Sequence, residues 1–230
     1  MSKTVMKMKD YSNYHNINTG DKVDHDGLLL LNKSLDGHSS YEVVINYEKP
    51  AKILMSQKWD ADGEAMKVIG HIVDIERGNL IEYNNEYWLV VTKPEDNRIY
   101  RKAEVRLCST TFPVKLEDKE VLTGYDKLGR PVYEVEEGEI VHKPCVVKMN
   151  DASTAIADAN EPVNLLANQV MVIIPYTEAP SIELNEQFDL YNETYRIIRI
   201  DPSSSINKVG ILRITGEREG RNKSSEEDYE

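Results

Sequence analysis

The sequence predicts a mainly β protein with two related small β-barrel, or sandwich-like, units, an extended N-terminal arm and a polar C-terminal tail. Three observations lead to this fold class. From residue 41 onward, short segments rich in β-branched and aromatic residues alternate with turn sequences of Asn, Asp and Gly. Amphipathic helical patterns are nearly absent there. One segment, residues 83–94, is echoed further along the chain at residues 191–202.

Composition sets the outer bounds of size and environment. The 230 residues suffice for one large or two small domains. A net charge of −12 argues against a large phosphate-binding surface and suits a surface that DNA slides past without sequence-specific contact. The apolar runs are far shorter than the ~20 residues that cross a bilayer, and no secretion signal is recognisable at the N-terminus. We therefore expect no membrane partner and assembly in the cytoplasm.

Residues 1–40 are expected to form the extended arm. They mix Lys, Asp, Asn, Tyr, His and Gly around one run of four leucines at residues 28–31, without a sustained helical or strand period. Asp24 to Gly27 resemble the start of a calcium loop, as do Asp60 to Gly63. Neither has a carboxylate at the loop's last position, so we expect plain hairpin turns at both places.

The first barrel unit is predicted over residues 41–110. Its strand-length segments have β-branched or aromatic character and lie at residues 41–45, 53–55, 68–73, 80–83 and 87–92. A connecting hairpin that protrudes from the body is predicted over 111–142, with strands near 121–125 and 131–135. The second unit covers 143–216 and includes a short helix candidate at 151–159, and the polar tail covers 217–230.

The internal echo is the most informative feature of the sequence. At an offset of 108 residues, both tyrosines, the first asparagine and the proline of residues 83–94 align with those of 191–202. The flanking segments also match in order, 49–55 with 143–149 and 102–107 with 208–214. We therefore predict a hairpin with a three-residue Asn-containing turn in each copy, produced by duplication. The alternative is chance likeness between two hairpins of similar composition.

Catalysis is not expected. The five histidines are scattered, nucleotide-binding and hydrolase motifs are absent from the sequence, and Cys108 and Cys145 fit buried apolar positions better than a zinc site. Carboxylates at strand spacing favour solvated strand faces, but a glycosidase would need such a pair in a cleft. The pairs are Asp74 with Glu76 and Glu134 with Glu136. We predict no catalytic, cofactor-binding or metal-binding residues, with a carbohydrate-binding or hydrolytic protein as an alternative.

Tyrosine usage indicates a protein built for contacts. The chain has 13 Tyr against 2 Phe and 2 Trp, and tyrosine, which joins apolar area to a polar tip, is enriched at interfaces. An arm, a hairpin and a tail are the segments most available to partners. The predicted partner-binding residues on them are Tyr11, Tyr14, His15, Tyr125, Tyr133 and Tyr229.

Between Ile53 and Cys108 the sequence resembles a family of head-to-tail connector, or head-closure, proteins encoded by tailed bacteriophages of Gram-positive bacteria. The cues are the strand at residues 53–55, the segment 78–83 before the hairpin, residues 88–91, and residues 100–103 leading to Cys108. Residues 9–13 followed by 18–20 fit the same pattern.

The resemblance implies a virion protein that assembles in the bacterial host. It would form a ring of its own copies below the portal or adaptor protein, close the filled head and give tail proteins a docking surface. The second hairpin unit departs from a single-barrel version of this family, so other virion roles stay open. These are a tail, collar or head-decorating protein.

Overall fold

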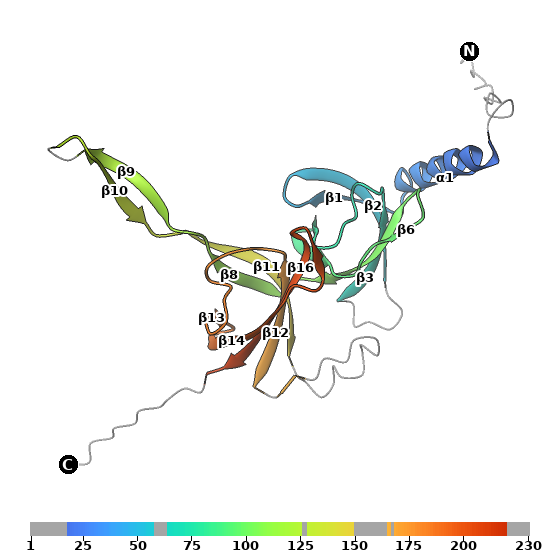
Figure 1. Ribbon diagram of the computed structural model, residues 1–230. Helices are drawn as coiled ribbons and strands as arrows, with labels where there is room; N and C mark the ends of the chain where they lie inside the picture. The colour runs from blue at the N-terminus through green and yellow to red at the C-terminus, as the bar shows by residue number, and fades with distance from the viewer. Residues whose placement is uncertain (1–17, 58–63, 126–127, 150–164, 167, 220–230) are drawn as a thin grey trace.

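The computed structural model describes residues 18–57, 64–125, 128–149, 165–166 and 168–219, and over these residues the chain is mainly β, as predicted (Figure 1). The helix candidate at 151–159 and the turn at 60–63 lie outside the described residues. The described elements are α1 (Thr19–Leu35), β1 (Ser40–Ile45), β2 (Lys49–Gln57), β3 (Ala65–Gly70), β4 (Leu80–Tyr83), β5 (Glu86–Val90), β6 (Glu95–Asp96), β7 (Arg101–Leu107), β8 (Thr110–Lys115), β9 (Lys119–Tyr125), β10 (Pro131–Glu136), β11 (Ile140–Met149), β12 (Gln169–Pro175), β13 (Gln187–Leu190), β14 (Glu193–Asp201), β15 (Ser205–Ile206) and β16 (Val209–Arg218).

The first barrel is closed. Its antiparallel strands follow the order β3-β2-β1-β4-β5-β7, and β3 pairs with β7 to complete the ring. Alternate residues of these strands point inward. They bury a core that includes Ile53, Val68, Ile81, Trp88 and Val105.

The second barrel is nearly closed. Its strands follow the order β13-β14-β16-β12-β11-β8, so β8 and β13 are its two edges. Ser181 fastens the β8 edge, because its Oγ accepts a hydrogen bond from the amide of Lys115 at 2.9 Å and donates to the carbonyl of the same residue. Pro113 lies two residues before Lys115, with its imide nitrogen on the same open edge. A proline there offers no donor to a stray strand.

The two barrels repeat one topology. Replacing β1, β2, β3, β4, β5 and β7 by β8, β11, β12, β13, β14 and β16 converts the first strand order into the second when both are read around the ring. The β1–β4 pairing of the first barrel corresponds to the open edge between β8 and β13. The short strands β6 and β15 also occupy equivalent places, before β7 and before β16. The predicted pair of related units is therefore confirmed. The first barrel joins its first two strands by a tight turn at residues 46–48, whereas the second inserts the β9–β10 hairpin between β8 and β11.

This insertion changes the expected boundaries. Residues 110–115 and 140–142 were predicted outside the second unit, but they belong to its strands β8 and β11. The hairpin proper spans residues 119–136.

The echoed hairpins exist, but the predicted turn length was wrong by one residue. Each turn has two residues with positive φ, Asn84 and Asn85 in the first barrel, Tyr191 and Asn192 in the second. Two such residues make the tight turn that matches the twist of a hairpin. Structurally equivalent residues of the two hairpins are therefore 107 positions apart in the sequence. Buried Tyr195 of the second barrel takes the place that Trp88 has in the first.

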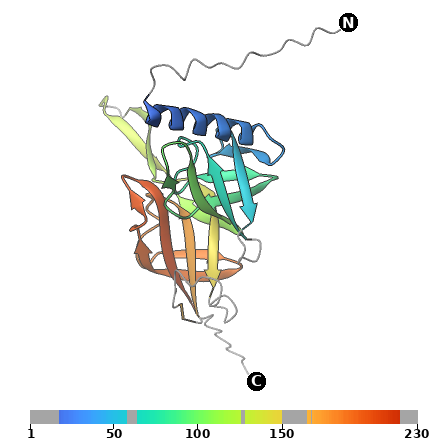
Figure 2. The same cartoon turned by 90° about the vertical axis from the view of Figure 1, so that its right-hand side faces the viewer.

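A third apolar core joins the barrels. Leu80 and Leu89, on the outside of the first barrel, pack against Val146, Ile173 and Ile211 of the second. Burying each such side chain contributes about 1.5–3 kcal/mol relative to exposing it. The two barrels consequently form one body, stacked in Figure 2 with the first barrel above the second.

Polar and backbone contacts close the same junction. The guanidinium of Arg77 donates from Nε to the carbonyl of Val91 at 3.0 Å and from Nη1 to the carbonyl of Ser204 at 3.4 Å. Gly78 lies so close to Gly210 that a Cβ on it would overlap the Gly210 carbonyl oxygen. Glycine is therefore required where the two backbones meet.

Residues 19–35 correct the prediction of an extended arm, because they form α1 across one end of the first barrel (Figure 2). Asn18 caps the helix by accepting a hydrogen bond from the amide of Gly20 at 3.3 Å, and Asp36 is its C-cap. Asp24 to Gly27 lie inside this helix, so the expected hairpin turn there was also wrong. Among the described residues no helix is long and apolar enough to span a membrane.

Candidate partner-binding surfaces

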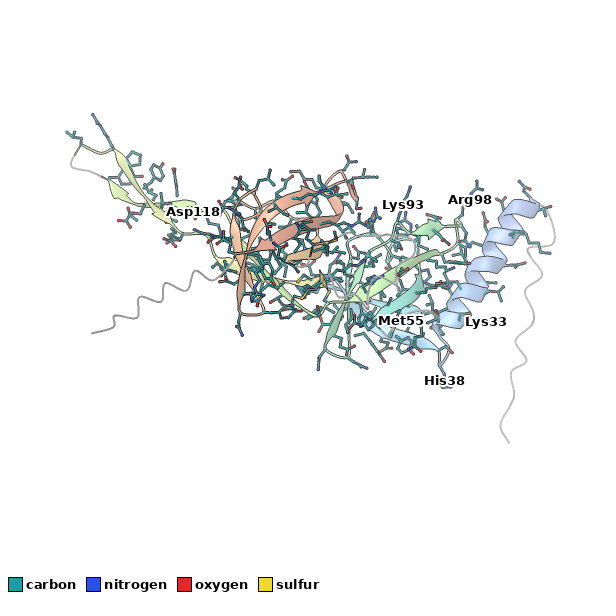
Figure 3. All side chains as sticks on the ribbon, turned by 90° about the horizontal axis from the view of Figure 1, so that it is seen from below. Lys33, His38, Met55, Lys93, Arg98 and Asp118 are labelled. Carbon is teal, nitrogen blue, oxygen red and sulfur yellow. The ribbon has the colours of Figure 1, made fainter. Side chains whose placement is uncertain are left out.

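The β9–β10 hairpin, here called the ribbon, projects away from the second barrel (Figures 1 and 3). Its base is fixed. Asp118 Oδ1 accepts a hydrogen bond from the amide of Gly138 at 2.7 Å, and the amide of Leu116 donates to the carbonyl of Glu139 at 3.0 Å. The ribbon is thus a continuation of the β8–β11 pair and keeps its direction.

A β-bulge determines which side chains share a face of the ribbon. Leu122 pairs with Tyr133, and after a register shift at Thr123 the partner of Pro131 is Tyr125. Directly paired residues lie on the same face, and a strand alternates faces with a period of two. The bulge therefore brings Tyr125 onto the face of Tyr133, whereas an unbroken register would place it on the other.

One face of the ribbon is apolar and uncovered. It consists of Leu122, Tyr125, Pro131, Tyr133 and Val135, with Glu120 opposite Val135 at the end near the barrel, and we call it the tyrosine face. Its two tyrosines are 69% and 55% exposed. An isolated two-stranded hairpin is at best marginally stable in water. The opposite face carries Lys119, Val121, Glu134 and Glu136, so the tyrosine face is the one suited to a partner.

Helix α1 exposes several apolar side chains. Its inner face is narrow: Leu31 and Leu35 are buried, and Gly27 lies directly against Ile99. Four other apolar side chains of the helix, Val23, Leu28, Leu29 and Leu30, are between 42% and 66% exposed. They do not share one face, because consecutive helical residues point about 100° apart and Asp26 lies between Val23 and Leu30. The exposed leucines of α1 therefore do not form a single docking surface.

The structure brings together two of the predicted partner-binding residues, Tyr125 and Tyr133, on one face. Tyr11, Tyr14, His15 and Tyr229 lie outside the described residues. Sequence reasoning missed helix α1, although an asparagine cap, an aspartate in the first turn and a lysine in the last turn frame a helix around the four leucines. It also missed Leu122, which the bulged register places opposite Tyr133, and Val135, which lies two residues after Tyr133 on the same face.

The carboxylate pairs do not converge. Asp74 was expected on a solvated strand, but it is buried in a turn, where its Oδ1 lies 2.6 Å from Nζ of Lys49. Glu76, two residues away, is exposed. Glu134 and Glu136 share the polar face of the ribbon. The first pair lies between β3 and β4 of the first barrel and the second on β10 of the ribbon, so the two pairs sit on separate parts of the molecule.

The two thiols lie at or near the inter-barrel junction. Cys145 is buried in the second barrel and Cys108 packs against the core between the barrels. Burial raises the pKa of both thiols to about 12, so both are neutral near pH 7. Among the described residues there is no group of three or more His, Cys, Asp or Glu side chains placed to hold a metal ion.

Two family models match most of the chain: the YomX N-terminal domain over residues 13–107 and the YomX C-terminal domain over residues 110–217. The chain belongs to the YomX family. Its two domains meet where the first barrel ends at β7 and the second begins at β8.

A relative in the YomX family is the SPbeta prophage-derived uncharacterized protein YomX of Bacillus subtilis (strain 168). It is 33% identical over 213 residues, which are 92% of this chain and 97% of the relative. The phage connection predicted from the sequence is thereby confirmed at the level of the family, and the connector role stays a prediction. Among solved structures, MrkH from K. pneumonia matches over 86% of this chain and 85% of its own at 8% identity, with a TM-score of 0.20. That score is too low to support any inference.

Proposed function

We propose that this YomX family member is a structural subunit of a tailed-phage particle, placed in the head-to-tail connector, where it closes the head and docks the tail. The observation that carries the proposal is the uncovered tyrosine face on a ribbon that is held firmly at its base. An apolar face of this kind marks a protein–protein interface. Its partners would be copies of itself, a portal or adaptor protein, and tail proteins.

The body of the protein supports a mechanical role. The apolar core shared by the two barrels favours a fixed spacing, and a load applied to the ribbon would pass through that core to the first barrel. The proposal assigns no reaction, cofactor or metal to the chain. Both cysteines are neutral thiols, and the buried carboxylate of Asp74 already pairs with Lys49.

The net charge of −12 supports a place beside passing DNA. A surface without excess positive charge does not gain the counterion release that makes proteins adhere to phosphates. DNA would therefore leave or enter the head past such a subunit without being retained by it.

Induction of the phage that carries the gene tests the proposal. Particles separated on a density gradient are analysed by mass spectrometry, and the chain is expected in intact virions at several copies per portal ring. In a deletion strain we expect filled heads and free tails that do not join. Absence of the chain from purified virions would refute the proposal, and tails that join normally would move the protein to another virion role, in the tail, the collar or the head surface.

A further inference from the structure

A pair of tyrosines lies on the outside of the first barrel, beside a carboxylate. Tyr47, in the tight turn between β1 and β2, and Tyr87, on β5, have ring centroids 5.5 Å apart, and the rings are inclined at 54°. Tyr47 is 55% exposed and Tyr87 is half-buried. Glu82, on β4, is the direct antiparallel partner of Tyr87, so its side chain leaves the same face of the sheet. These three side chains form one surface, here called the Tyr47 patch.

The backbone of Tyr47 sets this residue apart from an ordinary turn residue. Its φ is +66°, and it follows Asn46, with a φ of +52°, at a position where a tight hairpin turn usually has glycine. A bulky side chain is disfavoured in this conformation. Residues held in such conformations gather at sites of binding and catalysis. The turn would form more easily without the ring, so the ring itself is the feature that needs a function.

The carboxylate of Glu82 is available to a cation from outside the chain. Among the described residues it takes part in no ion pair. The structurally equivalent carboxylate of the second barrel is already satisfied, because Asp189 pairs across its hairpin with Thr194 and accepts a hydrogen bond from its hydroxyl at 2.8 Å. In the first barrel Tyr87 takes the place of Thr194.

Two other carboxylates beside tyrosines receive their cation from the chain itself. Glu178 accepts a hydrogen bond from the hydroxyl of Tyr176 at 2.8 Å and lies 2.6 Å from Nζ of Lys208. Glu193 also accepts a hydrogen bond from a tyrosine hydroxyl, and it pairs with Arg218. The Tyr47 patch has the tyrosines and the carboxylate of such a group, and its cation has to come from a partner.

The electrostatic surroundings of Tyr47 favour positive charge. Burial raises the pKa of the Tyr47 phenol, and the neighbouring Tyr87, Cys108 and Glu82 add to the rise because negative charge on any of them disfavours the phenolate. The same negative charge attracts a cation, as does the electron-rich face of an aromatic ring. The net charge of −12 extends this preference to the whole molecule.

We infer that the Tyr47 patch binds an arginine side chain of a partner protein. The planar guanidinium would lie on the exposed ring of Tyr47 and donate a hydrogen bond to the carboxylate of Glu82. Arginine combines both contacts, since its guanidinium stacks on aromatic rings and pairs with carboxylates. The inference goes beyond the proposed function, on which it rests for its biological setting, because it names the chemistry of a partner at a contact separate from the ribbon.

The partner segment that carries the arginine would reach both barrels. The amide of Cys108 donates to the carbonyl of Tyr87 at 2.7 Å, and the hydroxyl of Tyr191 donates to Oγ of the next residue, Ser109, at 3.3 Å. Tyr191 is 51% exposed and also has positive φ, +52°. Residues 108–109 are the whole connection between β7 and β8, so the Tyr47 patch borders the junction of the two barrels.

NMR of the tyrosine rings in the full chain tests the inference. Protein with isotope-labelled tyrosine is titrated with N-acetylarginine amide, and N-acetylcitrulline amide is the matched control probe, because it keeps the shape of the side chain and lacks the charge. We expect the ring signals of Tyr47 and Tyr87 to move at least about 5-fold further with the arginine probe at equal concentration. The ring signal of Tyr176 should not move, since Lys208 already pairs with the carboxylate beside it.

Two variants remove the two contacts separately. Tyr47→Gly deletes the ring and supplies the residue that the turn favours, and it should abolish the response of Tyr87. Glu82→Gln keeps the size of the side chain and removes its charge, and it should reduce the response of Tyr47 at least about 3-fold. Glu178→Gln is the matched control for a lost charge and should leave that response unchanged. The other tyrosine signals in the same spectra show that each variant is folded.

Three results would overturn the inference. They are equal movement with the arginine and citrulline probes, a larger response to N-acetyllysine amide than to the arginine probe, and an unchanged response in folded Glu82→Gln.

The proposed function and this inference fail separately. A chain found in virions whose Tyr47 patch does not respond to the arginine probe keeps its virion role and loses the inferred contact. A chain that responds to the probe but is absent from virions binds a basic partner in another setting.

Discussion

Replacing Gly78 by alanine tests whether the two barrels behave as one body. A Cβ at this position would overlap the carbonyl oxygen of Gly210 and lie 2.6 Å from its carbonyl carbon, so backbone of the second barrel has to move. Gly78 also has a φ of +90°, which an L side chain disfavours by about 1–2 kcal/mol.

The expected cost follows from the contacts that move. Displacing the Gly210 carbonyl disturbs the hydrogen bond it accepts from the amide of Tyr176 at 2.9 Å, worth about 1 kcal/mol. It also pulls neighbouring Ile211 away from the inter-barrel core, at about 1 kcal/mol for each methylene group uncovered. With the backbone term, the free energy of unfolding should fall by about 3–4 kcal/mol, a large share of the 5–15 kcal/mol typical of folded proteins.

Urea unfolding followed by tryptophan fluorescence and by circular dichroism measures this loss. Gly129→Ala is the matched control, since its φ is +76° but nothing lies within 4 Å of the added Cβ. It should cost at most the backbone term of about 1–2 kcal/mol. If Gly78→Ala falls within about 1 kcal/mol of this control, the close approach of the barrels carries no energetic weight and the reasoning is refuted.

Three further predictions concern other parts of the molecule. Replacing residues 119–136 by an Asn-Gly turn should leave the unfolding midpoint unchanged and abolish self-association, as measured by urea titration and sedimentation; a lowered midpoint would show that the ribbon supports the barrel. Lys49→Met leaves Asp74 buried beside no ammonium and should cost about 1–3 kcal/mol, whereas Lys49→Arg should cost less. The thiols of Cys108 and Cys145 should react with maleimide at pH 8 about 1,000-fold more slowly in the native protein than in urea. The reason is that a pKa raised from 9 to about 12 lowers the thiolate fraction by about that factor. Equal rates in the two conditions would contradict the burial of both cysteines.

Much of the fold could be predicted from the sequence because hairpins are encoded locally. Asparagines that tolerate positive φ, between segments that alternate apolar and polar residues, were enough to find both echoed hairpins. The register was off by one residue, since the two tyrosines that guided the alignment are not structurally equivalent. Tyr83 ends a strand, whereas Tyr191 is inside a turn. The sequence alignment followed the similarity of residue types and not the pattern of buried positions.

Helix α1 and the tyrosine face could be predicted only in part, for a common physical reason. Secondary structure is recognised from the side chains that pack inward, and α1 buries little more than Leu31 and Leu35 while exposing its other leucines. The bulge at Thr123 depends on the pairing of two strands and has no local signature. Both depart from the ordinary burial pattern, and the tyrosine face does so where we propose that a partner binds.

The position of the ribbon inside the second barrel has a consequence for how such proteins diversify. At the equivalent place the first barrel needs only the three residues between β1 and β2, so nothing in the barrel architecture demands a long connection. Exchange of that one segment by recombination would give a phage lineage a new docking specificity while every ladder of both barrels is inherited unchanged. Attachment and scaffolding are thereby open to separate selection within a single gene.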